Sequence, residues 1–134
     1  MADALATGAK FRKAVEEHDL VSARECMSEN VEFHSPVAFK HYSSLETVMA
    51  LLTHVSQTFE DFVYIDDIHS GSSHMLRFKA RVGDKAIEGV DLLEMGEDGL
   101  VEKFTVMVRP LSAAIALAQA MGARIEAAGG VPGA

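Results

Sequence analysis

With 134 residues, 49% of them hydrophobic, the chain is long enough for one domain with a sizeable core and too apolar to stay disordered. The formal net charge of −8 argues against nucleic acid as a partner, because phosphate binding needs a basic surface. A single cysteine, no signal-peptide pattern and no apolar run near the roughly 20 residues of a membrane span predict a cytoplasmic protein without a membrane partner.

Helical spacing of apolar residues dominates the first part of the chain. Apolar positions that recur every three or four residues predict helices over about 4–17, 20–28 and 45–56. Asp19 stands at the N-cap position of the second helix. Between the second and third helices, alternation predicts a short strand over 31–35.

A loop is expected over 37–42, after which the third helix leads into a region with a period of two. From residue 59 onward, this period predicts four consecutive antiparallel strands, the last two joined by a turn over 96–99. Pro110 ends the last strand and starts a final helix. We expect residues 1–134 to form a single domain with a flexible tail over 129–134.

The order of these elements, helices first, then strands, then a helix, indicates the α+β class rather than a doubly wound sheet. We expect a curved antiparallel sheet with the N-terminal helices packed on its concave face. Such an arrangement would enclose a cone-shaped pocket lined by the inward-facing side chains of the strands.

One carboxylate interrupts an otherwise apolar face of the predicted sheet. Alternation puts Ile87, Gly89, Asp91 and Leu93 on the same side of their strand. Removal from water raises the pKa of a carboxyl group. A protonated Asp91 would donate a hydrogen bond, and an ionised one would act as a base or orient a water. The alternative interpretation is structural, with Asp91 hydrogen-bonded within the fold to hold it together.

His34 and His74 are weaker candidates for catalysis, as bases that would work with Asp91. The histidines lack the spacing of a metal motif such as His-Glu-x-x-His, so we predict neither a metal site nor a cofactor. Eight further residues are expected to line the pocket and bind the ligand. They are Phe11, Val15, Ser35, Val37, Leu93, Phe104, Val106 and Val108.

The outer face of the predicted sheet has charged side chains around an apolar centre. Arg77, Lys79 and Arg81 can pair with Glu88 and Glu94 across neighbouring strands. The centre consists of Val90, Leu92, Thr105 and Met107. This pattern predicts a two-fold homodimer through the outer sheet face. The alternative is that the C-terminal helix covers this face.

Segments over nearly the whole chain resemble the nuclear transport factor 2-like superfamily, and within it the SnoaL-like and ketosteroid isomerase-like branch. The matching segments are 11–19, 31–37, 89–95 and Asp98-Gly99 with the long strand that follows. The resemblance implies a cystatin-like fold, which carries many different activities as well as plain binding.

Ketosteroid isomerases use three groups around the substrate. An acidic residue before a Pro-Val pair is the proton-transfer base, a tyrosine of the first helix donates to the steroid oxygen, and a protonated aspartate is the second donor. The matching positions here hold Ser35, Phe11 and Asp91. The resemblance therefore implies a protein that differs from a true ketosteroid isomerase and keeps Asp91 as its donor.

Together, these observations predict a SnoaL-like protein that binds a small, mostly apolar ligand through one oxygen held by Asp91. The enzymatic hypothesis is proton transfer in an isomerisation, cyclisation or dehydration, with Asp91 as acid or donor. The alternative is a non-catalytic binding or dimerisation module with the same fold.

Overall fold

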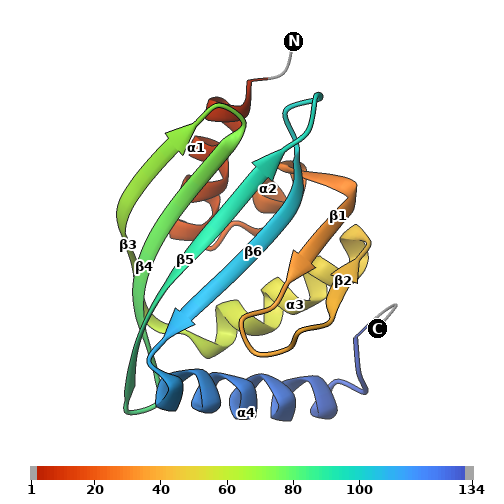
Figure 1. Ribbon diagram of the computed structural model, residues 1–134. Helices are drawn as coiled ribbons and strands as arrows, with labels where there is room; N and C mark the ends of the chain where they lie inside the picture. Colours follow the sequence, from red (N-terminus) through yellow and green to blue (C-terminus); the bar gives the residue numbers. More distant parts are fainter. Residues whose placement is uncertain (1–2, 132–134) are drawn as a thin grey trace.

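The computed structural model describes residues 3–131, which form four helices and one six-stranded sheet (Figure 1). The helices are α1 (Ala4–Glu16), α2 (Leu20–Glu25), α3 (Leu45–Thr58) and α4 (Leu111–Ala127). The strands are β1 (Met27–His34), β2 (His41–Ser43), β3 (Glu60–Ser70), β4 (Ser73–Val82), β5 (Lys85–Met95) and β6 (Val101–Arg109). Within residues 3–131, no helix is both long and apolar enough to cross a membrane. Part of the predicted tail, residues 132–134, lies outside the described residues.

The sheet has the strand order β2-β1-β6-β5-β4-β3. Strands β3 to β6 form the predicted antiparallel meander, whereas β1 lies parallel to β6 and β2 antiparallel to β1. The prediction of four consecutive strands therefore missed one edge of the sheet. With three residues, β2 is too short for alternation to reveal it, and the loop predicted over 37–42 is therefore wrong at residues 41 and 42. The strand predicted at 31–35 begins earlier, at Met27, and this shortens α2 to end at Glu25.

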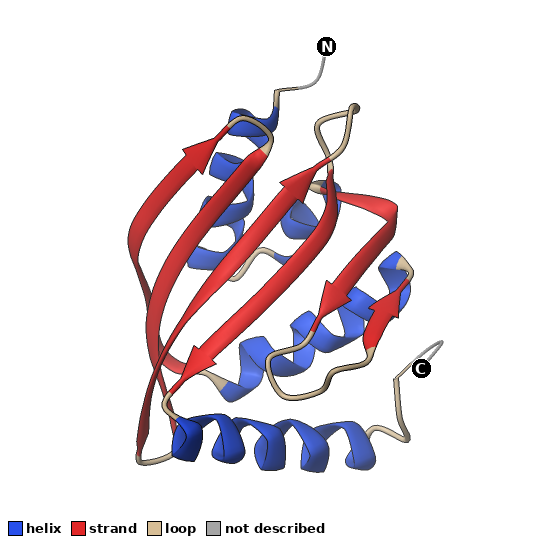
Figure 2. Ribbon diagram, viewed as in Figure 1, coloured by secondary structure: helices blue, strands red, loops and turns tan. Residues whose placement is uncertain are grey.

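All helices lie on one side of the curved sheet or at its end, as Figure 2 shows. Helices α1, α2 and α3 lie behind the sheet in this view, and α4 runs across its lower end. The predicted α+β architecture with N-terminal helices on the concave face is therefore confirmed. Helix α4 also packs toward the concave side, so within residues 3–131 no helix covers the convex face.

Side-chain caps fix where the helices nearest the concave face begin. The carboxylate of Asp19 accepts hydrogen bonds from the backbone N–H of Ser22 at 3.0 Å and from its hydroxyl at 2.6 Å. The hydroxyl of Ser44 accepts from the backbone N–H of Thr47 at 3.4 Å. The two bonds from backbone N–H groups satisfy donors that have no partner within their helices, α2 and α3.

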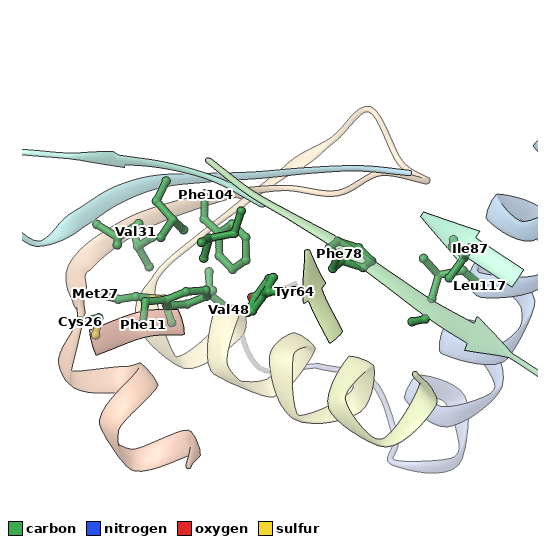
Figure 3. Packing of buried hydrophobic residues seen from close by; sticks show 14 of the residues in the cluster. Phe11, Cys26, Met27, Val31, Val48, Tyr64, Phe78, Ile87, Phe104 and Leu117 are labelled. Carbon is green, nitrogen blue, oxygen red and sulfur yellow. The ribbon is translucent and has the colours of Figure 1, made fainter. Parts of the chain in front are cut away.

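The core fills the space between the sheet and the helices (Figure 3). Phe11 of α1 meets Phe104 of β6 edge to face, with ring centroids 5.4 Å apart. Val31 of β1 and Val48 of α3 are fully buried. Each such side chain contributes about 1.5–3 kcal/mol when it leaves water. This packing holds α1 and α3 at a fixed distance from the sheet, leaving room for a cavity beside the core.

An irregularity in β3 changes which of its residues face inward. Tyr64 pairs with Phe78 of β4, but Asp67, three residues later, pairs with Leu76, only two residues away on the same strand. The additional residue in β3 is a β-bulge, which reverses the alternation of side chains beyond it. Tyr64 and Asp67 consequently both face the concave side.

Candidate active site

A cavity of about 270 Å³ lies between the concave face of the sheet and the helices α1, α3 and α4. Aromatic and aliphatic side chains make up most of its lining, among them Phe33, Leu52, Phe62 and Met121. The polar side chains in the lining are few. An apolar hollow with a small number of polar groups is typical of a site for a small organic molecule.

Asp91 of β5 and Tyr64 of β3 form a hydrogen-bonded pair in the cavity wall. The Tyr64 hydroxyl donates to Oδ2 of Asp91 at 2.6 Å. Both residues are buried, with 7% of Asp91 and 4% of Tyr64 exposed. Because β5 is an interior strand, Asp91 is flanked by Leu76 on one side and Val106 on the other. These apolar neighbours keep water away from the carboxyl group.

This environment shifts the pKa of both side chains. Burial raises the pKa of Asp91 to about 7, although the hydrogen bond from Tyr64 acts to lower it. Burial also raises the pKa of Tyr64 well above its usual value, and the charge and hydrogen bond of Asp91 raise it further. Tyr64 therefore remains a neutral donor, while Asp91 changes protonation state near neutral pH. A group that titrates there is well suited to accept and release a proton.

Six of the eight residues predicted to bind the ligand lie in the cavity wall. They are Phe11, Val15, Ser35, Val37, Phe104 and Val106. Leu93 faces the same side of the sheet but is fully buried in the core, and Val108 packs against the core. The structure gives neither of these two a place in the lining.

The two candidate histidines lie away from the cavity. His34 extends from the convex face of the sheet, opposite His41 of β2 and close to Glu32. His74 is buried beneath α1, where Nε2 contacts a carboxylate oxygen of Asp67. Neither histidine is brought to Asp91, so the geometry does not support a role for either as its partner base.

The cavity lining also has polar side chains outside the set predicted to bind the ligand or take part in catalysis. Tyr64 is the most important of them, and its orientation follows from the β3 bulge, which strict alternation does not reveal. His18 and Asp19, between α1 and α2, also line the cavity. His18 adopts a positive φ of 56°, which turns the chain between the two helices.

Neither the protein-family models nor the curated protein sequences gave a match to this chain. Several solved structures, in contrast, match this chain. A steroid delta-isomerase from Pseudomonas aeruginosa is 35% identical with a TM-score of 0.90, over 96% of this chain and 95% of that one. An uncharacterised protein with a cystatin-like fold from Silicibacter pomeroyi is 33% identical with a TM-score of 0.85, over 90% of this chain and 85% of that one.

More distant neighbours show the fold alone. One is a nuclear transport factor 2-like protein of unknown function from Cytophaga hutchinsonii, 18% identical with a TM-score of 0.63 over 82% of this chain and 93% of that one. From the two closer relatives, the chain belongs to the nuclear transport factor 2-like family, with its cystatin-like fold and ketosteroid isomerase-like members.

Proposed function

We propose that the protein binds a small, mostly apolar molecule through a single oxygen and transfers a proton to it from Asp91. The observation that carries this proposal is the Asp91–Tyr64 pair, a carboxyl group with a pKa of about 7 in the wall of an apolar cavity. Buried acids whose pKa is raised in this way cluster at functional sites.

The lining defines the class of ligand. A cavity of about 270 Å³ suits a compact molecule of one or two fused rings, and its aromatic and aliphatic walls favour a hydrocarbon body. The buried polar pair needs one oxygen atom to match it, because an unmatched buried polar group costs binding energy. A cyclic ketone, its enol or a phenol has these features.

The reaction consistent with the site uses one acid. Asp91 gives its proton to the ligand oxygen, and the carboxylate that remains is stabilised by the Tyr64 hydroxyl. Isomerisation, cyclisation and dehydration can all begin with this step. Ser35 and Phe11 line the same cavity at the places where the family resemblance puts a base and a tyrosine donor. A substrate other than that of a true ketosteroid isomerase is therefore expected.

Binding of 2-naphthol, an apolar fused-ring phenol, tests the proposal, with its fluorescence as the readout. We expect the wild-type protein to bind this probe and Asp91→Asn to weaken binding at least tenfold, since an amide N–H is a weaker hydrogen-bond donor to the phenol oxygen than a carboxylic acid. Asp84→Asn is the control, because Asp84 is exposed in the turn between β4 and β5. Carboxyl-carbon NMR supplies a second readout. Titration of Asp91 near the ordinary value of about 3.9, with no binding of the probe, would overturn the proposal.

A second candidate function is binding without catalysis. It is favoured by the hydrogen bond from Tyr64, which already satisfies one oxygen of Asp91 within the fold. Incubation with enolisable cyclic ketones in deuterated water separates the two functions. Deuterium exchange next to the carbonyl that is lost in Asp91→Asn supports proton transfer, whereas tight binding with exchange at the solvent rate supports a carrier.

We also propose that a second copy of the chain packs on the convex face. Four apolar side chains there are each more than a third exposed: Val63, Ile68, Met75 and Met107. Arg77 bonds to Asp66 and Glu88 across the strands, so charges of both signs lie beside the apolar area. In a two-fold dimer the same face of both copies meets, so the apolar and charged areas of one copy would lie against those of the other.

Sedimentation velocity tests this dimer. Met107→Glu places a charge in the centre of the face and is expected to shift the protein toward the monomer mass of 14.5 kDa. Val21→Glu is the control, since Val21 is an apolar residue on α2 that is even more exposed than Met107 and lies away from the convex face. A wild-type protein that sediments as a monomer at high micromolar concentration would contradict the proposal.

A further inference from the structure

Three metal-ligating side chains meet on the convex side of the β1–β2 hairpin. They are Glu32 and His34 of β1 and His41 of β2. One ligand atom from each lies within 4.8 Å of the others. The group is separate from the cavity, which opens on the other face of the same hairpin.

The register of the hairpin explains why these side chains converge. His34 and His41 are directly opposite each other, and Glu32 is two residues before His34 on the same strand. Residues two apart on a strand share a face, so all three side chains leave the hairpin on the same side. The imidazole rings are stacked, with centroids 5.2 Å apart and an angle of 17° between their planes.

The distances are close to those of a coordination sphere. Ligands at about 2.0–2.1 Å from a tetrahedral zinc ion lie about 3.3–3.4 Å from one another. Oε1 of Glu32 is 3.3 Å from Nε2 of His41 and 3.9 Å from Nε2 of His34. The His34 ring would have to turn from its stacked position to bring the third ligand to the same spacing.

The His34 ring supplies an independent indication of a missing partner. Its Nε2 atom is buried and has no hydrogen-bond partner among residues 3–131. A buried polar atom without a partner carries a desolvation cost that a ligand can remove. The His41 side chain on the edge strand β2 is 52% exposed, so ions from solvent can reach the cluster from this side.

We propose that Glu32, His34 and His41 bind one divalent transition-metal ion, with Zn²⁺ as the representative ion. Two imidazoles and one carboxylate suit zinc, nickel or copper and disfavour magnesium and calcium, which prefer oxygen ligands. Water completes the coordination, since three protein ligands leave a position open. Although the linear spacing of the histidines predicts no metal site, the cluster forms because the hairpin brings residues 34 and 41 together.

The position of the cluster gives the ion an effect on the cavity. The connection between β1 and β2 supplies Ser35, Pro36, Val37 and Ala38 to the cavity lining. A metal ion that joins the two strands closes this segment into a loop anchored at both ends. Bound metal is therefore expected to stabilise the hairpin and tighten binding of an apolar ligand in the cavity.

Isothermal titration with Zn²⁺, on protein carrying no polyhistidine tag, tests the site. We expect one ion per chain, with at least tenfold weaker binding in each of His34→Ala, His41→Ala and Glu32→Gln. His69→Ala is the matched control. His69 is an exposed histidine on β3, at the opposite edge of the sheet, so its removal is expected to leave binding unchanged.

Two further readouts make the outcome decisive. Zn²⁺ is expected to raise the melting temperature of the wild-type and His69→Ala proteins but not of the three cluster variants. Co²⁺ in place of Zn²⁺ is expected to give the intense visible absorption of a four-coordinate site. Binding that survives His34→Ala and His41→Ala together, or the same affinity for Mg²⁺ as for Zn²⁺, would overturn the proposal.

Discussion

Asp91 of β5 and Asp67 of β3 both extend from the concave side of the sheet, and each is hydrogen-bonded to a neighbouring side chain. The partner of Asp91 is the neutral hydroxyl of Tyr64. Asp67 instead accepts a hydrogen bond from the guanidinium of Arg12 at 2.9 Å and contacts the ring of His74. The side chain of Asp67 keeps 30% of its surface exposed, whereas Asp91 is buried.

The pKa values of the two carboxyl groups move in opposite directions. Burial raises the pKa of Asp91 to about 7, and one neutral hydrogen bond is too weak to reverse this. Burial also acts to raise the pKa of Asp67, but the hydrogen bonds from Arg12 and His74 outweigh it and lower the pKa below its usual value. The comparison shows that a cationic partner decides whether an inward-facing carboxylate stays ionised. Asp67 is suited to hold α1 on the sheet, and Asp91 to exchange a proton.

The largest expected effect is the dependence of stability on pH. In the folded protein Asp91 stays protonated up to about pH 7, whereas in the unfolded chain it ionises near pH 4. Its contribution to the free energy of unfolding therefore falls as pH rises from about 4 to 7, by about 4 kcal/mol in total, and changes no further above that range. Urea unfolding across this interval is expected to show the loss in the wild type and not in Asp91→Asn.

Asp84→Asn provides the reference for this measurement, because Asp84 is exposed in a turn and its variant should retain the wild-type slope. A slope that is equally steep in Asp91→Asn would mean that other groups cause the dependence, and would break the contrast between the two aspartates.

A second prediction concerns the packing of α1 on His74, the residue whose ring contacts Asp67. His74 lies so close to Gly8 of α1 that a methyl group on this glycine would overlap its ring. Gly8→Ala should therefore lower the free energy of unfolding by about 1–3 kcal/mol, despite the higher helix propensity of alanine. Gly122→Ala in α4 meets nothing within 4 Å and should raise it by about 0.5–1 kcal/mol. Thermal or urea unfolding of both variants measures the difference.

An increase in the free energy of unfolding in both Gly8→Ala and Gly122→Ala would show that α1 does not rest on His74. In that case the helix must tolerate a shift away from the sheet. The contact between Asp67 and His74 would then not depend on the position of His74 beneath α1.

The sequence assigns Asp91 to the inner face of the sheet but leaves the face of Tyr64 open, for a definite physical reason. Regular alternation of buried and less buried residues holds along β4 and β5, so an acid on an apolar face could be recognised at Asp91 without a structure. Alternation fails at the β3 bulge, which turns both Tyr64 and Asp67 inward. A pattern with period two can assign only one of these two residues, three apart, to the inner face.

Long-range contacts were the second limit on prediction. Arg12 and Asp67 are 55 residues apart, and nothing in their local sequence links them. The same holds for the pairing of β1 with β6 and for the meeting of His34 with His41 across a loop. The order of the elements predicts the overall architecture, but these contacts needed the three-dimensional fold.

A third, smaller effect is expected from Asp67→Asn. The amide weakens the charged hydrogen bonds to Arg12 and His74, so we expect a loss of about 1–2 kcal/mol in the free energy of unfolding at neutral pH. Because the pKa of Asp67 is lowered on folding, its stabilisation is present above about pH 4 and disappears as the pH falls further. The difference between the two proteins should therefore shrink in urea unfolding at about pH 2–3. A deficit that stays constant with pH would assign the loss to packing.

The smallest change in stability is expected from Tyr64→Phe, which alters only the neutral partner of Asp91. In Tyr64→Phe the hydrogen bond that lowers the pKa of Asp91 is removed while the burial that raises it remains, so the pKa should rise above about 7. The stability change at acid pH should stay near 1 kcal/mol, the usual net value of one hydrogen bond. Carboxyl-carbon NMR of the variant measures the shift. Tyr42→Phe removes another hydroxyl from the cavity lining and should leave the titration unchanged. A fall in the pKa of Asp91 in Tyr64→Phe would mean that water takes the place of the hydroxyl, and that the oxygen of Tyr64, more than its aromatic ring, keeps the carboxyl group dry.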